Sequence, residues 1–206
     1  MRTEDLHADL IAELADTVWL DTALETVARQ PAAIARLFPA AGRRCGRWML
    51  RDHGRTPPGW SVDDAARVLL LARLPRESAA TEAEPLYRYG DAAEKRAVLR
   101  ALPLLDLPPA VVRPLLLDAL RTNDTRLVAA ALGPAARHLD AAAWRQGVLK
   151  AVFMQLPLCD VADLDERADA ELATMLGGLA QERAAAGRTM AADATELLHR
   201  LQERVS

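Results

Sequence analysis

Apolar residues recur every three to four positions along most of this chain of 206 residues, a spacing that predicts amphipathic α-helices. The first stripe begins near Glu4 and predicts a helix that continues to Val27, with Pro31 ending it or restarting a second helix through Leu37. Pro39 opens a further helical run that reaches Leu50. Later stripes and cap signals predict helices at about 61–74, 91–105, 110–121, 125–138, 140–156, 165–186 and 191–204.

Two polar segments interrupt the helical pattern. Residues 52–59 are rich in Pro and Gly and form the clearest loop, and residues 76–85 are also expected to be a loop. We therefore expect a single helical domain, 1–206, made of an N-terminal helical arm at 1–52 and a main helical core at 60–206. Within the core, Ser61 with Asp64 and Asp91 with Glu94 resemble capping boxes.

Helix spacing and composition together indicate the fold class. The predicted starts at 91, 109, 124 and 140 are 18, 15 and 16 residues apart, which is typical of short antiparallel helices joined by tight turns. The chain has 42 Ala and 34 Leu against 12 Val and 2 Ile, which favours helices over sheets. The sequence predicts an all-α fold of about eight helices, arranged as a HEAT-like stack of helical hairpins or as an irregular bundle.

Charge and apolar run length narrow the classes of function. The net charge of −3 gives no basic excess for nucleic acid, and the arginines between 43 and 51 are interpreted as a solvated helix face. No apolar run approaches the length of a transmembrane segment and no secretion signal is visible, so we expect a cytoplasmic protein. Cys45 and Cys159 are interpreted as two small buried hydrophobic residues rather than a disulfide.

Common catalytic motifs are absent from the sequence. It contains no phosphate-binding loop, no dinucleotide-binding glycine motif, no HExxH and no GxSxG. The four histidines are isolated from one another, without the paired spacing that metal ligands show on a helix: His7, His53, His138 and His199. We therefore predict no bound metal and no cofactor.

Lys150 is the most conspicuous candidate for chemistry. Arg outnumbers Lys 24 to 2, and Lys150 is the only charge between Gly147 and Met154 in the most apolar predicted helix. Gln146 lies one turn before it, and Trp144 belongs to the same helix. A lysine there is either a pocket ammonium for an anionic or carbonyl group, or a structural lysine that pairs with Asp165 or Glu166.

Three further segments carry polar candidates. Asn123 and Asp124 lie at a turn between two predicted helices, where they are either a C-cap followed by an N-cap or, with Arg121 beside the free N–H groups of the next helix, part of an anion-binding corner. Asp165 and Arg167 open the next long helix, where capping alone also explains the acid. Tyr87 lies among arginines and fits either a polar pocket wall or a locked turn.

Five blocks in a fixed order resemble the EboA family. They are Tyr87–Lys95, Val98–Leu105, Ala119–Asn123, Asp140–Lys150 and Leu164–Ala168, and the resemblance spans about residues 80–187. The family is encoded in ebo gene clusters beside enzymes that resemble a prenyltransferase, a metal-dependent hydrolase and a sugar-phosphate cyclase. The resemblance therefore implies a part in making or trafficking a specialised metabolite, and it carries over no catalytic residue.

These observations lead to one function hypothesis and one alternative. The protein is expected to be an accessory or binding protein that presents a helical groove to a polar or anionic small molecule, or to a partner enzyme of the prenyltransferase, hydrolase or cyclase type. The alternative is an enzyme that uses Lys150 and Asp165 for acid–base chemistry. The hypothetical ligand site comprises Tyr87, Arg121, Asn123, Trp144, Gln146, Lys150, Asp165 and Arg167, with Arg121 and Lys150 holding an anion and Trp144 forming an apolar wall.

Overall fold

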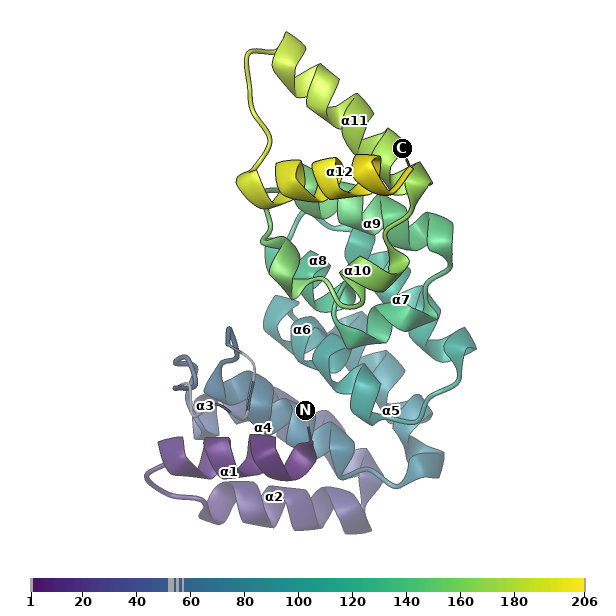
Figure 1. The fold of residues 1–206 in the computed structure, drawn as a ribbon. Coiled ribbons are helices and arrows are strands. Elements are labelled where there is room, and N and C mark those ends of the chain that lie inside the picture. Colours follow the sequence, from purple (N-terminus) through teal and green to yellow (C-terminus); the bar gives the residue numbers. More distant parts are fainter. Residues whose placement is uncertain (1, 52–53, 55, 57, 206) are drawn as a thin grey trace. The chain divides into compact units, whose positions relative to one another are not determined.

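The computed structural model describes residues 2–51, 54, 56 and 58–205, and this part of the chain is helical without a β-strand (Figure 1). The predicted all-α fold class is confirmed. The chain divides into two compact units, Met1–Leu115 and Leu116–Ser206. Each unit is described by itself below.

The first unit is built around one central helix. Its helices are α1 (Thr3–Glu13), α2 (Val18–Arg29), η1 (Pro31–Ala33), α3 (Ile34–Arg44), α4 (Val62–Ala72), α5 (Arg76–Tyr89), α6 (Ala92–Ala101) and η2 (Leu102–Leu104), where η marks a 3-10 helix. Helix α4 packs against α1, α2, α3 and α6, and it is buried from Val62 to Leu71. It therefore carries the hydrophobic core of this unit.

Charged residues of α4 are buried with their partners. Asp64 is fully buried and pairs with Arg96 at 2.8 Å and with Arg100 at 2.8 Å, both from α6. On the next turn, Arg67 is 1% exposed and pairs with Asp63 at 2.5 Å. A buried charge is tolerated only when it is paired and hydrogen-bonded, so this network fixes α6 against α4.

Asp63 shows how the network holds a carboxylate in its ionised form. Burial alone raises the pKa of Asp63, but hydrogen bonds from Ser61 at 2.6 Å and from Arg67 outweigh it, so the pKa lies below its usual range. The Ser61 hydroxyl therefore donates to Asp63 and makes no capping hydrogen bond at the start of α4. The expected capping box of Ser61 with Asp64 is wrong.

The second unit contains the remaining helices. They are α8 (Thr125–Ala131), η3 (Pro134–His138), α9 (Ala141–Phe153), η4 (Leu158–Asp160), α10 (Leu164–Arg167), α11 (Ala170–Ala185) and α12 (Ala192–Val205), while α7 (Pro109–Arg121) runs across the boundary between the units. Helix α9 packs against α8 and α11, and α12 packs against α11. The predicted capping box of Asp91 with Glu94 is confirmed at α6, and the side chains of Asp124 and Asp140 accept backbone N–H groups at the starts of α8 and α9.

The described residues form twelve α-helices rather than about eight. Two of the predicted helices are divided, and one predicted loop is helical. The stripe from Glu4 to Val27 breaks before α2, where the Asp16 carboxylate accepts the Val18 N–H at 2.8 Å. Similarly, Asp169 caps α11 and separates it from α10.

The expected loop at 76–85 is wrong, because this segment belongs to α5. Ala79, Ala83 and Tyr87 recur every four residues and are buried, which supplies the apolar stripe that a helix needs. The many alanines and glutamates of the segment also have high helix propensity.

The remaining organisational predictions are untested. The expected loop at 52–59 lies largely outside the described residues, and the division into an arm at 1–52 and a core at 60–206 stays a prediction. The HEAT-like arrangement is not confirmed and also stays a prediction.

Candidate functional site

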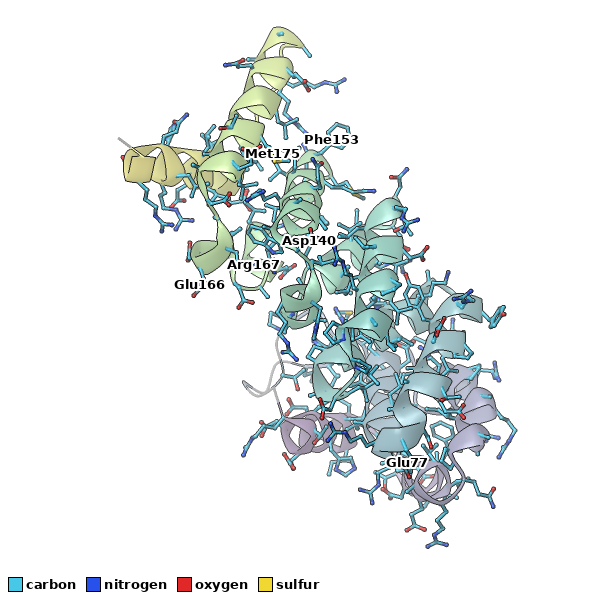
Figure 2. The ribbon with its side chains drawn as sticks, turned by 90° about the vertical axis from the view of Figure 1, so that its right-hand side faces the viewer. Glu77, Asp140, Phe153, Glu166, Arg167 and Met175 are labelled. Carbon is cyan, nitrogen blue, oxygen red and sulfur yellow. The ribbon has the colours of Figure 1, made fainter. Side chains whose placement is uncertain are left out.

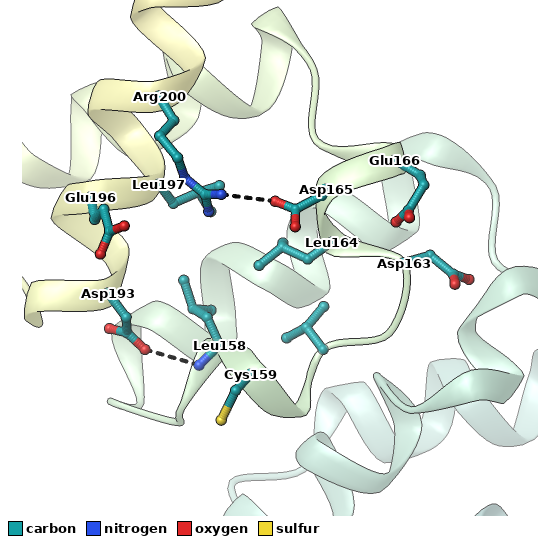
Figure 3. A pocket seen from close by; sticks show the side chains of 11 residues that line it. Leu158, Cys159, Asp163, Leu164, Asp165, Glu166, Asp193, Glu196, Leu197 and Arg200 are labelled. Atoms are coloured by element: carbon teal, nitrogen blue, oxygen red, sulfur yellow. Dashed lines mark hydrogen bonds and ion pairs between the residues drawn. The ribbon is translucent and has the colours of Figure 1, made fainter. Parts of the chain in front are cut away.

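A pocket of about 410 Å³ lies in the second unit between the segment from η4 to α10 and one face of α12 (Figure 3). Asp193, Glu196, Leu197 and Arg200 line it from α12, at the three- and four-residue intervals that place side chains on one helix face. Five carboxylates and one guanidinium surround the pocket: Asp163, Asp165, Glu166, Asp193, Glu196 and Arg200. The pocket is therefore strongly acidic.

Two polar contacts hold the pocket walls together. The Leu158 N–H donates to Asp193 Oδ2 at 2.9 Å, and Arg200 Nη1 donates to Asp165 Oδ1 at 3.0 Å (Figure 3). Both contacts tie α12 to the segment that precedes α11. Asp163 turns the chain into α10 with a left-handed backbone of φ 55°, a conformation that Asp tolerates better than most residues.

Apolar side chains form the floor beneath this acidic rim. Leu158, Val161 and Leu197 line the pocket and are buried, and Leu164 lies between the pocket and the Arg200–Asp165 pair. Small-molecule sites generally have volumes of about 300–1,000 Å³, a range that includes this pocket. Six of its eleven lining residues are charged, so a ligand here would mainly meet polar groups.

One hydrogen-bond donor beside the pocket is unused. Arg200 Nε is shielded from solvent, and it has no hydrogen-bond partner within the described residues. A buried donor without a partner costs free energy.

Of the eight residues predicted to bind a ligand, Asp165 alone lines this pocket. Tyr87 belongs to the first unit, where it is buried in α5 with the Lys95 ammonium 5.4 Å from its ring centre. Arg121, Asn123 and Gln146 are exposed in the second unit. The eight-residue site as a whole stays a prediction.

Arg167, labelled in Figure 2, lies against the Trp144 ring within the second unit. The Arg167 guanidinium stacks 4.7 Å from the ring centre of the buried Trp144. It also donates to the backbone oxygens of Ala136 at 2.7 Å and Leu139 at 2.9 Å, and burial lowers the pKa of Arg167. These contacts give both residues a structural role.

Lys150 caps the C-terminal end of α7. Its ammonium donates to the Leu120 backbone oxygen at 2.8 Å, in the last turn of α7. Carbonyls at a helix C-terminus lack partners inside the helix and carry partial negative charge, so a lysine stabilises them. The carboxylate of Asp165, the expected partner of Lys150, pairs with Arg200 instead.

Lys150→Met is therefore expected to destabilise the second unit by about 1–2 kcal/mol, because it keeps the aliphatic stem and removes one charged hydrogen bond. Gln146→Met on the same helix is the control, with an expected change within about 0.5 kcal/mol. Hydrogen exchange of α7 amides in both variants measures the difference. Equal exchange in the two variants would contradict the capping role.

The anion-binding corner near Asn123 gains no support from the local geometry. Asp124 already occupies the start of α8, where its carboxylate accepts the Arg126 N–H at 2.9 Å. The Arg126 side chain lowers the pKa of Asp124, which therefore keeps its negative charge at neutral pH. A second anion would be repelled from this position.

The two cysteines differ in exposure. Both are free thiols, and Cys45 is buried as expected, whereas Cys159 is exposed at the pocket rim, so the expected burial of Cys159 is wrong. Burial raises the pKa of the Cys45 thiol to about 11. Only Cys159 has a reactive thiol accessible in the folded protein.

N-ethylmaleimide at pH 7.5 is expected to modify the native protein once, at Cys159, and to modify it twice in urea. Mass spectrometry of the intact chain counts the adducts, and peptide mapping places them. The Cys159→Ser variant serves as the control and should stay unmodified under native conditions. A rapid adduct on Cys45 in that variant would contradict the assignment.

Most of the pocket was not predicted from the sequence. The available signal was the spacing of Asp193, Glu196 and Arg200 on one face of the last predicted helix, a pattern that an ordinary amphipathic stripe also shows. The buried network of α4 and α6 was not predicted either, because Asp64 looked like a cap residue.

The structure is that of an all-α protein with a small, open, polar pocket. Comparison with known families gives the class: a family model described as "Metabolite traffic protein EboA" matches residues 11–199. The chain belongs to the EboA family, and the match extends well beyond the segment 80–187 found from the sequence blocks. No curated protein and no solved structure matches it significantly.

Two further structural findings bear on function. Within the described residues, no helix is both long and apolar enough to cross a membrane. Across the same part of the chain, no three His, Cys, Asp or Glu side chains come together as ligands for one metal ion. The acidic pocket is thus not arranged as a metal centre.

Proposed function

We propose that this protein is a non-catalytic binding protein of an ebo-type metabolite pathway, and that the acidic pocket of the second unit holds the metabolite. The pocket itself carries this proposal, because it combines an apolar floor, a polar rim and a volume of about 410 Å³. Membership of a family described by metabolite traffic is compatible with such a role.

The charge of the rim selects the chemistry of the ligand. Five carboxylates against one guanidinium repel an anion, so the anionic ligand expected from the sequence does not suit this pocket. Carboxylates accept hydrogen bonds, and the guanidinium of Arg200, which lines the same pocket, donates them. Hydroxyl groups satisfy both kinds of partner, which favours a neutral polyhydroxylated molecule with an apolar portion.

The alternative of an acid–base enzyme gains no support from the contacts of its two candidate residues. Lys150 is engaged at the end of α7, and Asp165 is paired with Arg200. A general base needs a free position facing the substrate. Lys150 does not line the pocket, and Asp165 lines it as the ion-pair partner of Arg200.

The same proposal implies partner enzymes for this protein. Enzymes of the prenyltransferase, hydrolase or cyclase type, which the EboA resemblance implies, would deliver or receive the bound molecule.

Consecutive helices pack against each other at α3–α4, α5–α6, α8–α9 and α11–α12, which supports the proposed helical-hairpin arrangement. Such hairpins leave loop and helix ends free for a partner.

Calorimetric titration with a panel of neutral cyclitols and sugars, each with its phosphorylated counterpart, tests the proposal. We expect a neutral member to bind and its phosphorylated form to bind more weakly. Glu196→Gln should weaken binding about tenfold, because a hydrogen bond to a charged group is lost. Glu203→Gln, on the same helix but outside the pocket, is the matched control.

Cys159→Trp provides an independent test, since the larger side chain fills the pocket rim while Cys159→Ser leaves it open. The proposal predicts binding by the serine variant and loss of binding by the tryptophan variant. Equal affinity in both variants, or tighter binding of the phosphorylated ligands, would overturn it.

A further inference from the structure

Basic residues are concentrated in one segment of the first unit. Residues 26–51 contain six arginines and no acidic residue, although the whole chain has a net charge of −3. Two of these arginines are paired at 3.7 Å, Arg29 with Glu25 and Arg51 with Glu13. The other four form no hydrogen bond or ion pair within the described part of the chain: Arg36, Arg43, Arg44 and Arg47.

Helix α3 carries Arg36, Arg43 and Arg44, and Arg47 follows its C-terminal end; all four residues are exposed. Its opposite face is buried through Ile34, Leu37, Phe38, Ala41 and Gly42. The Arg47 side chain folds back over Gly42, where an added Cβ would lie 2.7 Å from Arg47 Nε. Arg43 and Arg44 also suit the C-terminal end of α3, but this explains neither Arg36 nor Arg47.

Two large apolar side chains extend from the same segment. Trp48 is 50% exposed and Met49 is 58% exposed. The Trp48 ring covers Gly46, whose φ of 104° and missing Cβ allow this close approach. The backbone of Trp48 is fixed because its oxygen accepts the Val62 N–H at 2.9 Å. The structure thus presents an apolar pair in a defined position.

We propose that Arg36, Arg43, Arg44, Arg47, Trp48 and Met49 form a docking surface for an anionic phospholipid membrane. Arginine binds phosphate groups through parallel hydrogen bonds, and unpaired guanidinium groups lose no internal partner on docking. Tryptophan favours the boundary between headgroups and acyl chains, and a methionine beside it adds apolar area that can enter the same layer.

A nucleic acid is the other polyanion that such a surface could meet, and the apolar pair favours the membrane. Single-stranded nucleic acid binds through successive aromatic platforms, whereas this surface has one aromatic residue and a flexible thioether. Met49 stacks poorly on a base, but it gains by leaving water for an acyl layer. The proposal is independent of the pocket in the second unit.

Vesicle flotation of the full chain tests this surface. We compare phosphatidylcholine vesicles with vesicles that contain about 30% phosphatidylglycerol, at low and at high salt. The protein is expected to float with the anionic vesicles at low salt and to be released by salt, since exposed charges are screened. Arg43→Gln with Arg44→Gln should weaken partitioning at least about tenfold.

Matched variants test whether the loss of binding is specific to this surface or follows from removing any two positive charges or any exposed aromatic side chain. Arg137→Gln with Arg188→Gln removes the same charge from exposed positions of the second unit. Trp48→Ala should weaken partitioning, whereas Tyr89→Ala, at an 84% exposed residue, should not. Circular dichroism checks that each variant is folded.

Several results would overturn the proposal. They are absence of binding to anionic vesicles, equal binding to neutral and anionic vesicles, or equal losses in the matched variants. Fluorescence anisotropy with a 20-nucleotide RNA gives the remaining outcome. Tighter binding to this RNA than to anionic vesicles at the same salt concentration would assign the surface to nucleic acid instead.

Discussion

Asp64→Ala is expected to destabilise the first unit by about 3–5 kcal/mol, the largest effect that we expect from a single substitution. Asp64 is fully buried, and its carboxylate accepts hydrogen bonds from Arg96 and Arg100. Removing it leaves two guanidinium groups beside each other without their common anion. Arg100 also stacks over Trp60 at 4.7 Å, so its displacement disturbs the core.

Asp106→Ala is the control for this prediction. Asp106 pairs with Arg76, but both side chains are more than 70% exposed, so its loss should change stability by no more than about 0.5 kcal/mol. Hydrogen exchange with mass spectrometry follows each unit separately, which matters because two units need not unfold in one step. Protection of α4 and α6 that survives in Asp64→Ala would contradict the role of the network.

Arg167→Ala is expected to destabilise the second unit by about 2–4 kcal/mol. The substitution leaves the backbone oxygens of Ala136 and Leu139 without their donor and removes the stacking on Trp144. Binding of a pocket ligand should persist wherever the variant is folded, because Arg167 does not line the pocket.

Arg188→Ala, at an exposed arginine of the same unit, should be nearly neutral. Urea unfolding followed by Trp144 fluorescence, in variants whose other tryptophans are replaced by phenylalanine, measures both changes. An unaltered midpoint for Arg167→Ala would contradict the structural role. Loss of ligand binding at a temperature where the variant is fully folded would instead favour the ligand role predicted from the sequence.

Local signals in the sequence predicted the helices well where a cap and a stripe coincide. Asp91 with Glu94 and Asp140 both start helices as expected, because a short acidic side chain before an apolar stripe can satisfy the free N–H groups. The prediction for segment 76–85 failed because its buried positions, Ala79 and Ala83, are small residues among polar neighbours and give only a weak apolar stripe.

The candidate site was harder to predict, because polar residues serve packing as often as binding. Lys150 drew attention by its rarity, yet it completes the end of α7, a partner that only the folded chain brings near. Arg167 was predicted as a ligand residue, and in the folded chain it donates to the Ala136 backbone oxygen in η3 and stacks on Trp144. The pocket joins residues 158–166 with α12, and helix periodicity carries no information on such distant pairs.

The rate at which Cys159 is alkylated, measured with and without the best neutral ligand from the titration panel, is the most direct test of the central claim. Because Cys159 lies at the pocket rim, a bound ligand is expected to slow its modification at least about tenfold, with half-protection at the calorimetric Kd. A ligand that binds by calorimetry but leaves the Cys159 rate unchanged would place binding elsewhere and contradict the account.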